Sequence, residues 1–202
     1  MKYVCVFCGS SAGNRESYKV AARKLGRLLA EREYTLVYGG SNVGLMAIIA
    51  DEVLAMGGKV IGVMPDSLIE KEVAHPGLTE FIRSESMSDR KEIMMKMSDG
   101  FICMPGGVGT LDELFEVMSW NQLGLMSKPL ALLNTDQYWN QLLAFLDHTV
   151  QEKFVRIEHR SNLIHEEDEQ TLLDAMEEYN PTKLDKIAWI SSLRDTMKTE
   201  KD

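Results

Sequence analysis

Short apolar runs alternate along this chain with longer segments in which apolar residues recur at helical spacing. The first run, residues 2–8, ends at Gly9, and residues 17–33 then place apolar side chains one turn apart. The pattern repeats through most of the sequence. It predicts further strands at 35–38, 59–64, 80–83, 100–104 and 129–134, and further helices at 44–56, 88–97, from about 107 to 123, and 138–150.

This alternation, with strands that are apolar almost throughout, predicts an α/β fold: a Rossmann-like, doubly wound, mainly parallel sheet with helices on both faces. We expect one such domain over residues 1–180 and a tail over 181–202 that is helical or partly disordered and has no assigned role. Ligands of such folds bind at the carboxyl ends of the strands. Three predicted strands end in glycine-rich turns, at residues 9–11, 39–41 and 106–107.

Composition and net charge indicate which kinds of binding partner this protein is unsuited to. The chain has 45% apolar and 26% charged residues and a net charge of −9, which argues against nucleic-acid or anionic-membrane binding. No apolar stretch approaches the roughly 20 residues of a membrane span. The apolar run near the N-terminus, six residues long, is too short for a signal peptide. We therefore expect a cytoplasmic protein without nucleic-acid or membrane partners.

Three cysteines, Cys5, Cys8 and Cys103, fit a reducing compartment. The spacing of Cys5 and Cys8 matches a redox or zinc motif, but both fall in a predicted strand, where residues three apart point to opposite faces. No second pair of this spacing and no nearby histidine is present. We interpret these thiols as core residues and expect no metal.

The loop Pro105–Thr110 follows the predicted strand at 100–104. Gly106, Gly107 and Gly109 permit positive φ and close approach to bare backbone, and Thr110 is suited to capping the next helix. Backbone N–H groups at a helix start form an anion site, typically for phosphate. A packing turn is the alternative, and the loop alone does not decide between them. It matches neither the ATP-binding Gly-Lys-Ser/Thr loop nor the dinucleotide fingerprint.

The helix after this loop begins with three acidic residues, Asp112, Glu113 and Glu116. Acidic residues are favoured near a helix N-terminus, so solvated charges are one interpretation. However, Glu113 and Glu116 share a helix face. A carboxylate one turn from a bound phosphate would lie near the ribose of a nucleotide, where it can stabilise positive charge or activate water, as in glycoside hydrolases.

A second polar cluster covers Met87–Lys91. Ser88 or Asp89 is suited to capping the helix predicted there. Arg90 and Lys91 have two interpretations, a solvated helix face or contacts to a phosphate or base beside a strand end. The spacing alone leaves both open.

At this point the motifs resemble those of a known family. Residues 105–113 match the PGGxGTxxE motif of the LOG family, and residues 87–91 resemble its MHxRK motif. The family comprises cytokinin riboside 5′-monophosphate phosphoribohydrolases, long labelled lysine decarboxylases. The similarity extends in consistent order to about residue 180 and includes residues 7–11, 37–46, 120–124 and 128–129.

The resemblance implies a Rossmann-like homodimer that releases a free base and ribose 5-phosphate from a nucleoside 5′-monophosphate without metal or organic cofactor. It implies that Arg90 and Glu113 are the catalytic pair. The substrate contacts that it implies fall on Glu72, Lys91, Gly106, Gly107, Val108, Gly109, Thr110 and Ser119, the last where relatives commonly have threonine.

Three positions depart from the family pattern: Val108 replaces a tyrosine, Ser88 a histidine and Ala47 a glycine. No catalytic group is lost, but the preference for N6-prenylated adenine over plain adenine is left open. Two other functions were weighed. A decarboxylase would need a pyridoxal-phosphate lysine, and the lysines lack that context. A nucleotide-binding or sensor module without turnover would not need both Arg90 and Glu113.

Overall fold

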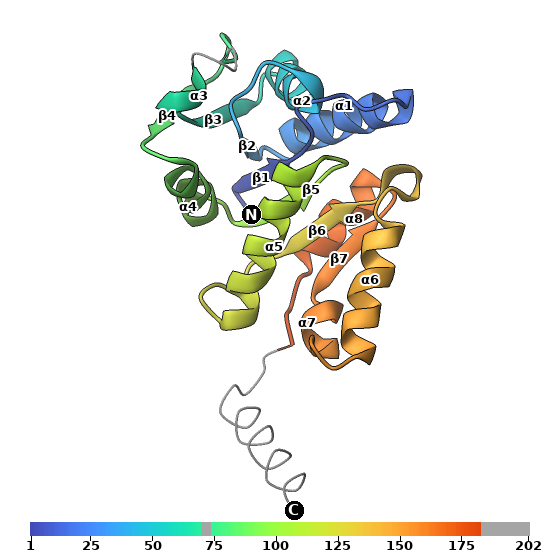
Figure 1. The fold of residues 1–202 in the computed structure, drawn as a ribbon. Helices are drawn as coiled ribbons and strands as arrows, with labels where there is room; N and C mark the ends of the chain where they lie inside the picture. The colour runs from blue at the N-terminus through green and yellow to red at the C-terminus, as the bar shows by residue number, and fades with distance from the viewer. Residues whose placement is uncertain (70–73, 183–202) are drawn as a thin grey trace, which may run out of the picture.

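The computed structural model describes residues 1–69 and 74–182. In this part of the chain, seven parallel strands form one sheet in the order β4-β3-β2-β1-β5-β6-β7 (Figure 1). Their bounds are β1 (Tyr3–Phe7), β2 (Thr35–Tyr38), β3 (Lys59–Pro65), β4 (Glu80–Ser84), β5 (Gly100–Cys103), β6 (Leu130–Leu133) and β7 (Leu163–Glu166).

The chain builds this sheet outward from β1 in two directions. Strands β2 to β4 extend it on one side, and β5 to β7 extend it on the other. The winding direction therefore reverses between β1 and β5, whose carboxyl ends are paired through Phe7 and Cys103. Doubly wound sheets bind ligands at such a switch point. The predicted fold class is confirmed.

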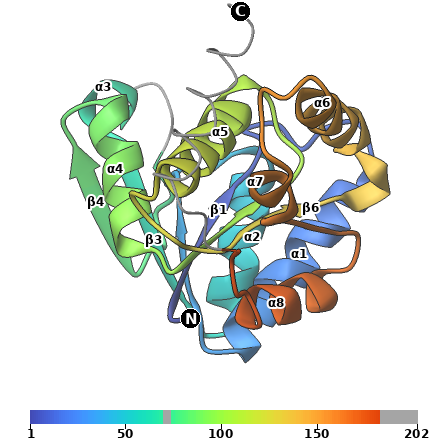
Figure 2. The ribbon, with the colours of Figure 1, turned by 90° about the horizontal axis from the view of Figure 1, so that it is seen from below.

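Helices cover both faces of the sheet, as Figure 2 shows. One face is covered by α1 (Glu16–Glu31), α2 (Gly44–Ala55) and α8 (Glu169–Glu177), and the other by α4 (Met87–Met97), α5 (Val108–Leu123) and α6 (Asn140–Gln151). Short helices α3 (Asp66–Ile69), η1 (Thr135–Gln137) and α7 (Ile157–Ser161) lie in connections.

Side chains of each strand alternate between the two cores. Val4 and Val6 of β1 pack with α1 and α2, and Cys5 and Phe7 pack on the other side. Cys8 belongs to the same core as Val4, so the two cysteines point to opposite faces as predicted. Both are buried and free, and burial raises the pKa of each thiol.

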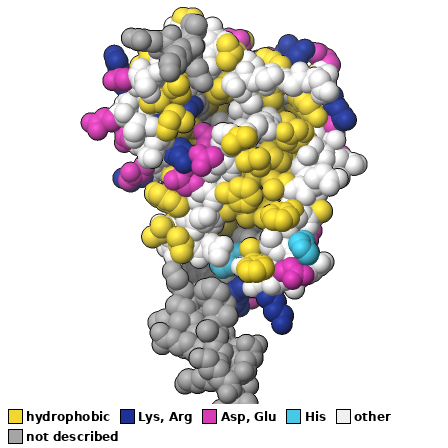
Figure 3. All heavy atoms as spheres, viewed as in Figure 1, with side chains coloured by type: hydrophobic (Ala, Val, Ile, Leu, Met, Phe, Trp, Pro, Cys, Tyr) yellow, Lys and Arg dark blue, Asp and Glu magenta, His cyan; other side chains and the backbone are white. Residues whose placement is uncertain are grey.

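Apolar side chains also reach the surface on the face covered by α5 and α6. Figure 3 shows hydrophobic side chains gathered over these two helices. The exposed aromatic side chains of these two helices are Phe115 on α5 and Phe145 on α6, which are 38% and 58% exposed. We call this surface the α5–α6 apolar face. Exposed aromatic side chains in such a group are typical of a surface that another molecule covers.

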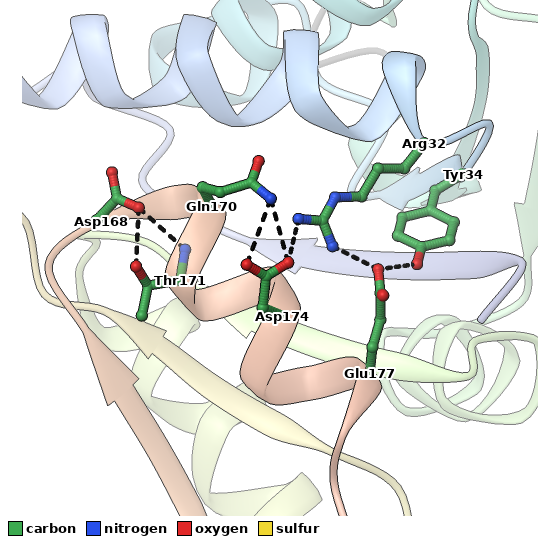
Figure 4. A network of polar contacts seen from close by, with 7 residues as sticks. All are labelled: Arg32, Tyr34, Asp168, Gln170, Thr171, Asp174 and Glu177. Atoms are coloured by element: carbon green, nitrogen blue, oxygen red, sulfur yellow. Dashed lines mark hydrogen bonds and ion pairs between the residues drawn. The ribbon is translucent and has the colours of Figure 1, made fainter.

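A polar network fastens α8 to the end of α1 (Figure 4). The Arg32 guanidinium contacts Asp174 at 2.5 Å and also pairs with Glu177. The Tyr34 hydroxyl donates to Glu177 at 2.5 Å. Asp168 caps α8 by accepting from the Thr171 backbone N–H. The domain therefore includes the chain at least to Glu177.

The predicted elements from 2 to 150 are present, with ends shifted by a few residues. The helix predicted from 138 begins at Asn140, after η1. Sequence patterning indicated none of α3, α7, β7 or α8, because they are only four to nine residues long and a periodic pattern needs a longer segment. Residues 183–202, most of the predicted tail, lie outside the described residues. No helix within the described ranges is long and apolar enough to cross a membrane.

Candidate active site

A pocket of about 270 Å³ opens where the carboxyl ends of β1, β2 and β5 meet. It lies at the switch point of the sheet, where the glycine-rich turns were predicted to meet. Its walls come from the ends of these strands and from the first turns of α4 and α5. The residues that line it include Cys8, Gly9, Ser10, Gly39, Met46, Leu68, Met87, Arg90, Lys91, Gly107, Val108, Gly109, Thr110, Asp112 and Glu113.

The glycine loop leaves its backbone bare on the pocket side. A Cβ added at Gly107 or Gly109 would meet no atom within 4 Å, so packing does not require glycine at either position. At Gly106 a Cβ would lie 2.2 Å from Thr110 Oγ1, so close packing does require glycine there. None of the three glycines uses the positive φ that glycine permits, and Gly107 has φ −98°. The open sides of Gly107 and Gly109 favour a ligand over a packing turn.

Helix α5 starts without a side-chain cap. Gly107 is the N-cap residue, with φ −98° and ψ −151°, so the prediction that Thr110 caps this helix is wrong. Thr110 lies one turn inside, 3% exposed, against Gly106. The backbone N–H groups of the first helical turn have no carbonyl partner within the helix. They remain free to bind an anion at the pocket.

Arg90 is buried under the ends of β2 and β3 and is 7% exposed, so it is not part of a solvated face. Its Nε donates to the Val63 carbonyl and its Nη2 to the Gly39 carbonyl, each at 3.0 Å. A Cβ on Gly39 would lie 2.0 Å from Nη2, so any side chain there would displace the guanidinium from its present position. Arg90 forms no salt bridge within the described ranges, and its charge acts on the Glu113 carboxyl at the pocket.

The start of α4 places this arginine. Ser86, rather than the predicted Ser88 or Asp89, is the N-cap, and its hydroxyl accepts from the Asp89 backbone N–H at 3.0 Å. The Asp89 carboxylate in turn accepts from the Glu85 backbone N–H at 2.9 Å. This reciprocal pair fixes the first turn of the helix. Arg90 then points beneath the sheet edge.

Glu113 lies on α5 at the pocket wall. Burial raises the pKa of its carboxyl from 4.5 to about 7. The charges of Arg90 and Lys91 act in the opposite direction, and those of Asp112 and Glu116 add to the rise. A carboxylate that titrates near neutral pH exchanges protons readily at that pH, as an acid–base catalyst must.

Lys91 lies beside Glu113 but is paired with its neighbours. Its Nζ is 2.9 Å from an Asp112 oxygen and 2.7 Å from a Glu116 oxygen. Burial alone would lower the pKa of Lys91, but these two contacts raise it. Glu113 and Glu116 share a helix side as predicted, yet only Glu113 lines the pocket.

The remaining predicted residues fall in different places. Val108 is 83% exposed at the pocket mouth. Ser119 lies on the exposed surface of α5 and does not line the pocket. Glu72 lies outside the described residues. The sequence analysis did not identify Met46 and Leu68 as pocket residues, although both line it. Met46 lies close to the glycine-rich end of β2, whereas nothing in the sequence marks Leu68.

No group of His, Cys, Asp and Glu side chains within the described residues is arranged to hold a metal ion. The site therefore offers backbone donors, one arginine and one carboxylate with a raised pKa. These groups bind anions and transfer protons.

Comparison with solved structures shows relatives of the fold. A molybdenum cofactor carrier protein from Chlamydomonas reinhardtii superposes with a TM-score of 0.68 at 20% identity, covering 88% of this chain and 97% of that one. A molybdenum cofactor binding protein from Rippkaea orientalis gives 0.67 at 22% identity, with 88% and 96% covered. At such identities the likeness concerns the fold alone.

Sequence comparison is more specific. Residues 46–176 match the family model described as "Possible lysine decarboxylase". The chain is 47% identical over 178 residues to the probable cytokinin riboside 5′-monophosphate phosphoribohydrolase LOGL9 of Oryza sativa subsp. japonica, covering 88% of this chain and 78% of that protein. It is 45% identical over 180 residues to the phosphoribohydrolase LOG1 of Arabidopsis thaliana, with 89% and 84% covered. This chain belongs to the LOG family of cytokinin riboside 5′-monophosphate phosphoribohydrolases.

Proposed function

We propose that this protein hydrolyses the N-glycosidic bond of an adenosine 5′-monophosphate, plain or modified at N6, to a free base and ribose 5-phosphate. One observation carries the proposal. A carboxyl whose pKa is about 7 lies in the same pocket as an uncapped glycine loop and a buried, unpaired arginine. The relatives of this protein in rice and Arabidopsis are named as phosphoribohydrolases.

The phosphate is proposed to bind at the glycine loop. Backbone N–H groups from Gly107 to Thr110 have no partner in the helix, and the N-terminal end of the α5 dipole is positive. Gly107 and Gly109 leave space for phosphate oxygens directly against the backbone. Binding energy at this end would hold the ribose in position for reaction at the other.

Glu113 and Arg90 are proposed to act at the ribose. Glu113 follows Gly109 by one helical turn, about 5.4 Å along the axis. Its carboxylate would take a proton from water as the water oxygen bonds to C1′ and the C1′–N bond breaks. The departing base would take up one proton from solvent, and Glu113 would return the proton it gained to solvent, so the products are neutral base and ribose 5-phosphate. The same carboxylate would stabilise the positive charge that develops on the ribose. The charge of Arg90 favours the ionised form of Glu113.

The base is proposed to lie against the apolar wall. Met46, Leu68 and Met87 are apolar residues of the pocket lining. Methionine and leucine side chains adapt to ligands of different shape. This wall supports adenine with an apolar N6 substituent as well as plain adenine.

The test is direct. The purified protein is incubated with AMP, with N6-isopentenyl-AMP and with adenosine, and free base is measured by chromatography. Both nucleotides should release base, and adenosine should be a poor substrate because it lacks the group that the loop binds. Binding without base release from any nucleotide would overturn the hydrolase and leave a binding module. Equal rates on adenosine and AMP would remove the role of the loop.

We also propose that two copies pack through the α5–α6 apolar face. Exposed Phe115 and Phe145 support this, since burying them removes apolar area from water. Ser119 follows Phe115 by one turn and would then face the partner copy. Light scattering should give the mass of a dimer, and Phe145→Glu should give a monomer. A monomeric wild-type protein at micromolar concentration would contradict the proposal.

Two coarser expectations remain proposals: that residues 1–180 form a single domain, and that the protein is cytoplasmic. The three free cysteines support the second. Cell fractionation would test it.

A further inference from the structure

The segment after β6 has an unusual backbone beside the glycine loop. Asp136 and Gln137, with φ of 51° and 60°, both adopt the left-handed conformation that favours glycine. Neither residue is glycine, so surrounding contacts must hold this conformation in place. Asp136 accepts a hydrogen bond from the Ser17 hydroxyl and lies 3.5 Å from Arg15 Nη1. On the other side, Asn134 Oδ1 accepts from the Trp139 backbone N–H at 2.7 Å.

This segment places Tyr138 against the loop. The Tyr138 hydroxyl donates to the Gly106 carbonyl oxygen at 2.6 Å, across 32 residues of sequence. The ring is fixed by edge-to-face contacts with Tyr18, at 5.8 Å between centroids, and with Trp139, at 4.8 Å. A strained turn, two aromatic contacts and a short hydrogen bond therefore converge on one carbonyl group.

That hydrogen bond sets the direction of a peptide plane. In a trans peptide the carbonyl of Gly106 and the N–H of Gly107 point in opposite directions. With the carbonyl turned to Tyr138, the N–H is directed to the opposite side of the loop, where Gly107 lines the pocket. A Gly-Gly peptide rotates easily because neither residue has a Cβ. A carbonyl turned toward the pocket would repel an anion.

We propose that Tyr138 is a positioning residue of the anion site: its hydroxyl holds the Gly106–Gly107 peptide with the N–H facing the 5′-phosphate. This inference rests on the proposed function of the loop. Tyr138 does not line the pocket and touches no reacting atom. It acts through the loop, and its effect is specific to ligands that carry a phosphate.

The test uses Tyr138→Phe, which removes the hydroxyl and keeps the ring contacts. The matched control is Tyr18→Phe, which removes a hydroxyl from the aromatic partner of Tyr138 without touching the loop. In Tyr138→Phe, KM for AMP and the inhibition constant of inorganic phosphate should both rise about 5- to 10-fold, since one fixed hydrogen bond is lost. Turnover of adenosine and the melting temperature should stay unchanged. Tyr18→Phe should match the wild type.

Two results would overturn the inference. One is a Tyr138→Phe variant whose KM for AMP and phosphate inhibition stay within about two-fold of wild type. The other is an equal loss on AMP and adenosine, which a purely structural role would give. Calorimetric titration with AMP separates this from the proposed function: a protein that binds AMP without cleaving it still reports the effect of Tyr138 on affinity. A protein that does not bind AMP overturns both.

Discussion

Two hollows lie at opposite ends of the sheet strands, and residues of α5 line both. They differ in size and in the polar groups around them. The pocket of about 270 Å³ is at the carboxyl ends of the strands, around the first turn of α5. A larger cavity of about 650 Å³ is at the amino ends, bounded by the last turns of α5, by α7 and by residues 179–182. Size alone would direct attention to the second.

The two hollows differ in whether their charged groups and backbone N–H groups have partners. At the amino-end cavity, Arg156 is paired with Glu158 at 2.8 Å. Burial, together with the charge of Arg156, lowers the pKa of His159 and favours its neutral form. The C-terminus of α5 is closed there by Gly124, with φ 71°, and by the Leu125 N–H to the Trp120 carbonyl at 2.9 Å. At the pocket, by contrast, the helix start is uncapped and Arg90 has no salt bridge within the described ranges. Free backbone donors and a buried arginine without a salt bridge among the described residues therefore favour the smaller pocket as the binding site.

The largest expected effect comes from Glu113→Gln. Loss of a general base reduces turnover by about 10²- to 10⁴-fold, while AMP binding is retained because the loop is intact. The control is Glu158→Gln, which changes the salt-bridge partner of Arg156 beside the amino-end cavity and should leave turnover unchanged. Base release is measured by chromatography and binding by calorimetry. Wild-type turnover in Glu113→Gln would refute its role.

Arg90→Lys tests the arginine as a structural group. Lysine keeps the charge but lacks the planar fork that contacts two carbonyls, so the free energy of unfolding should fall by about 1–3 kcal/mol. Arg156→Lys, at a partly exposed salt bridge, should change it by less than about 1 kcal/mol. Urea unfolding compares the two variants. An equal loss in the free energy of unfolding for both variants would show that the contacts of Arg90 stabilise the fold no more than those of Arg156.

The pH dependence follows from the raised pKa of Glu113. The ionised carboxylate is the reactive form, so kcat/KM should rise as pH rises toward about 7 and level off above it. Below this value it should fall about tenfold per pH unit. The phosphate of the substrate titrates near pH 6, so AMP affinity of Glu113→Gln over the same range isolates that contribution. A flat wild-type profile from about pH 5 to about pH 8 would contradict the assignment.

The smallest effect is expected at the amino-end cavity. Gln122→Ala changes an exposed residue that lines it, and kcat/KM should stay within about two-fold of wild type. A large loss of activity from this substitution would remove the contrast between the two hollows and connect the larger one to the reaction.

Local chemistry was predictable, and long-range geometry was not. The glycine loop and Glu113 lie within one strand–helix connection, so their spacing alone brought them together. The burial of Arg90 depends on carbonyls 27 and 51 residues earlier, which only the strand order places there. Thr110 has the residue type of a cap, but glycine takes that position as well. Helix α8 buries Leu172, Leu173 and Met176 in the core, but it is only nine residues long, and its ion pairs with Arg32 join residues more than 140 positions apart, which no local pattern predicts.

The structural contacts of Arg90 affect how a relative that has lost its catalytic activity can be recognised from its sequence. Its guanidinium holds the ends of β2 and β3, so selection for folding alone would preserve it in a descendant that had lost turnover. Glu113 is the opposite case: within the described ranges it forms no hydrogen bond or salt bridge, and burying its charge is unfavourable. A descendant freed from catalysis would gain stability by replacing it. Among homologous sequences, loss of the glutamate would therefore be the expected mark of a binder, whereas retention of the arginine alone would not indicate turnover.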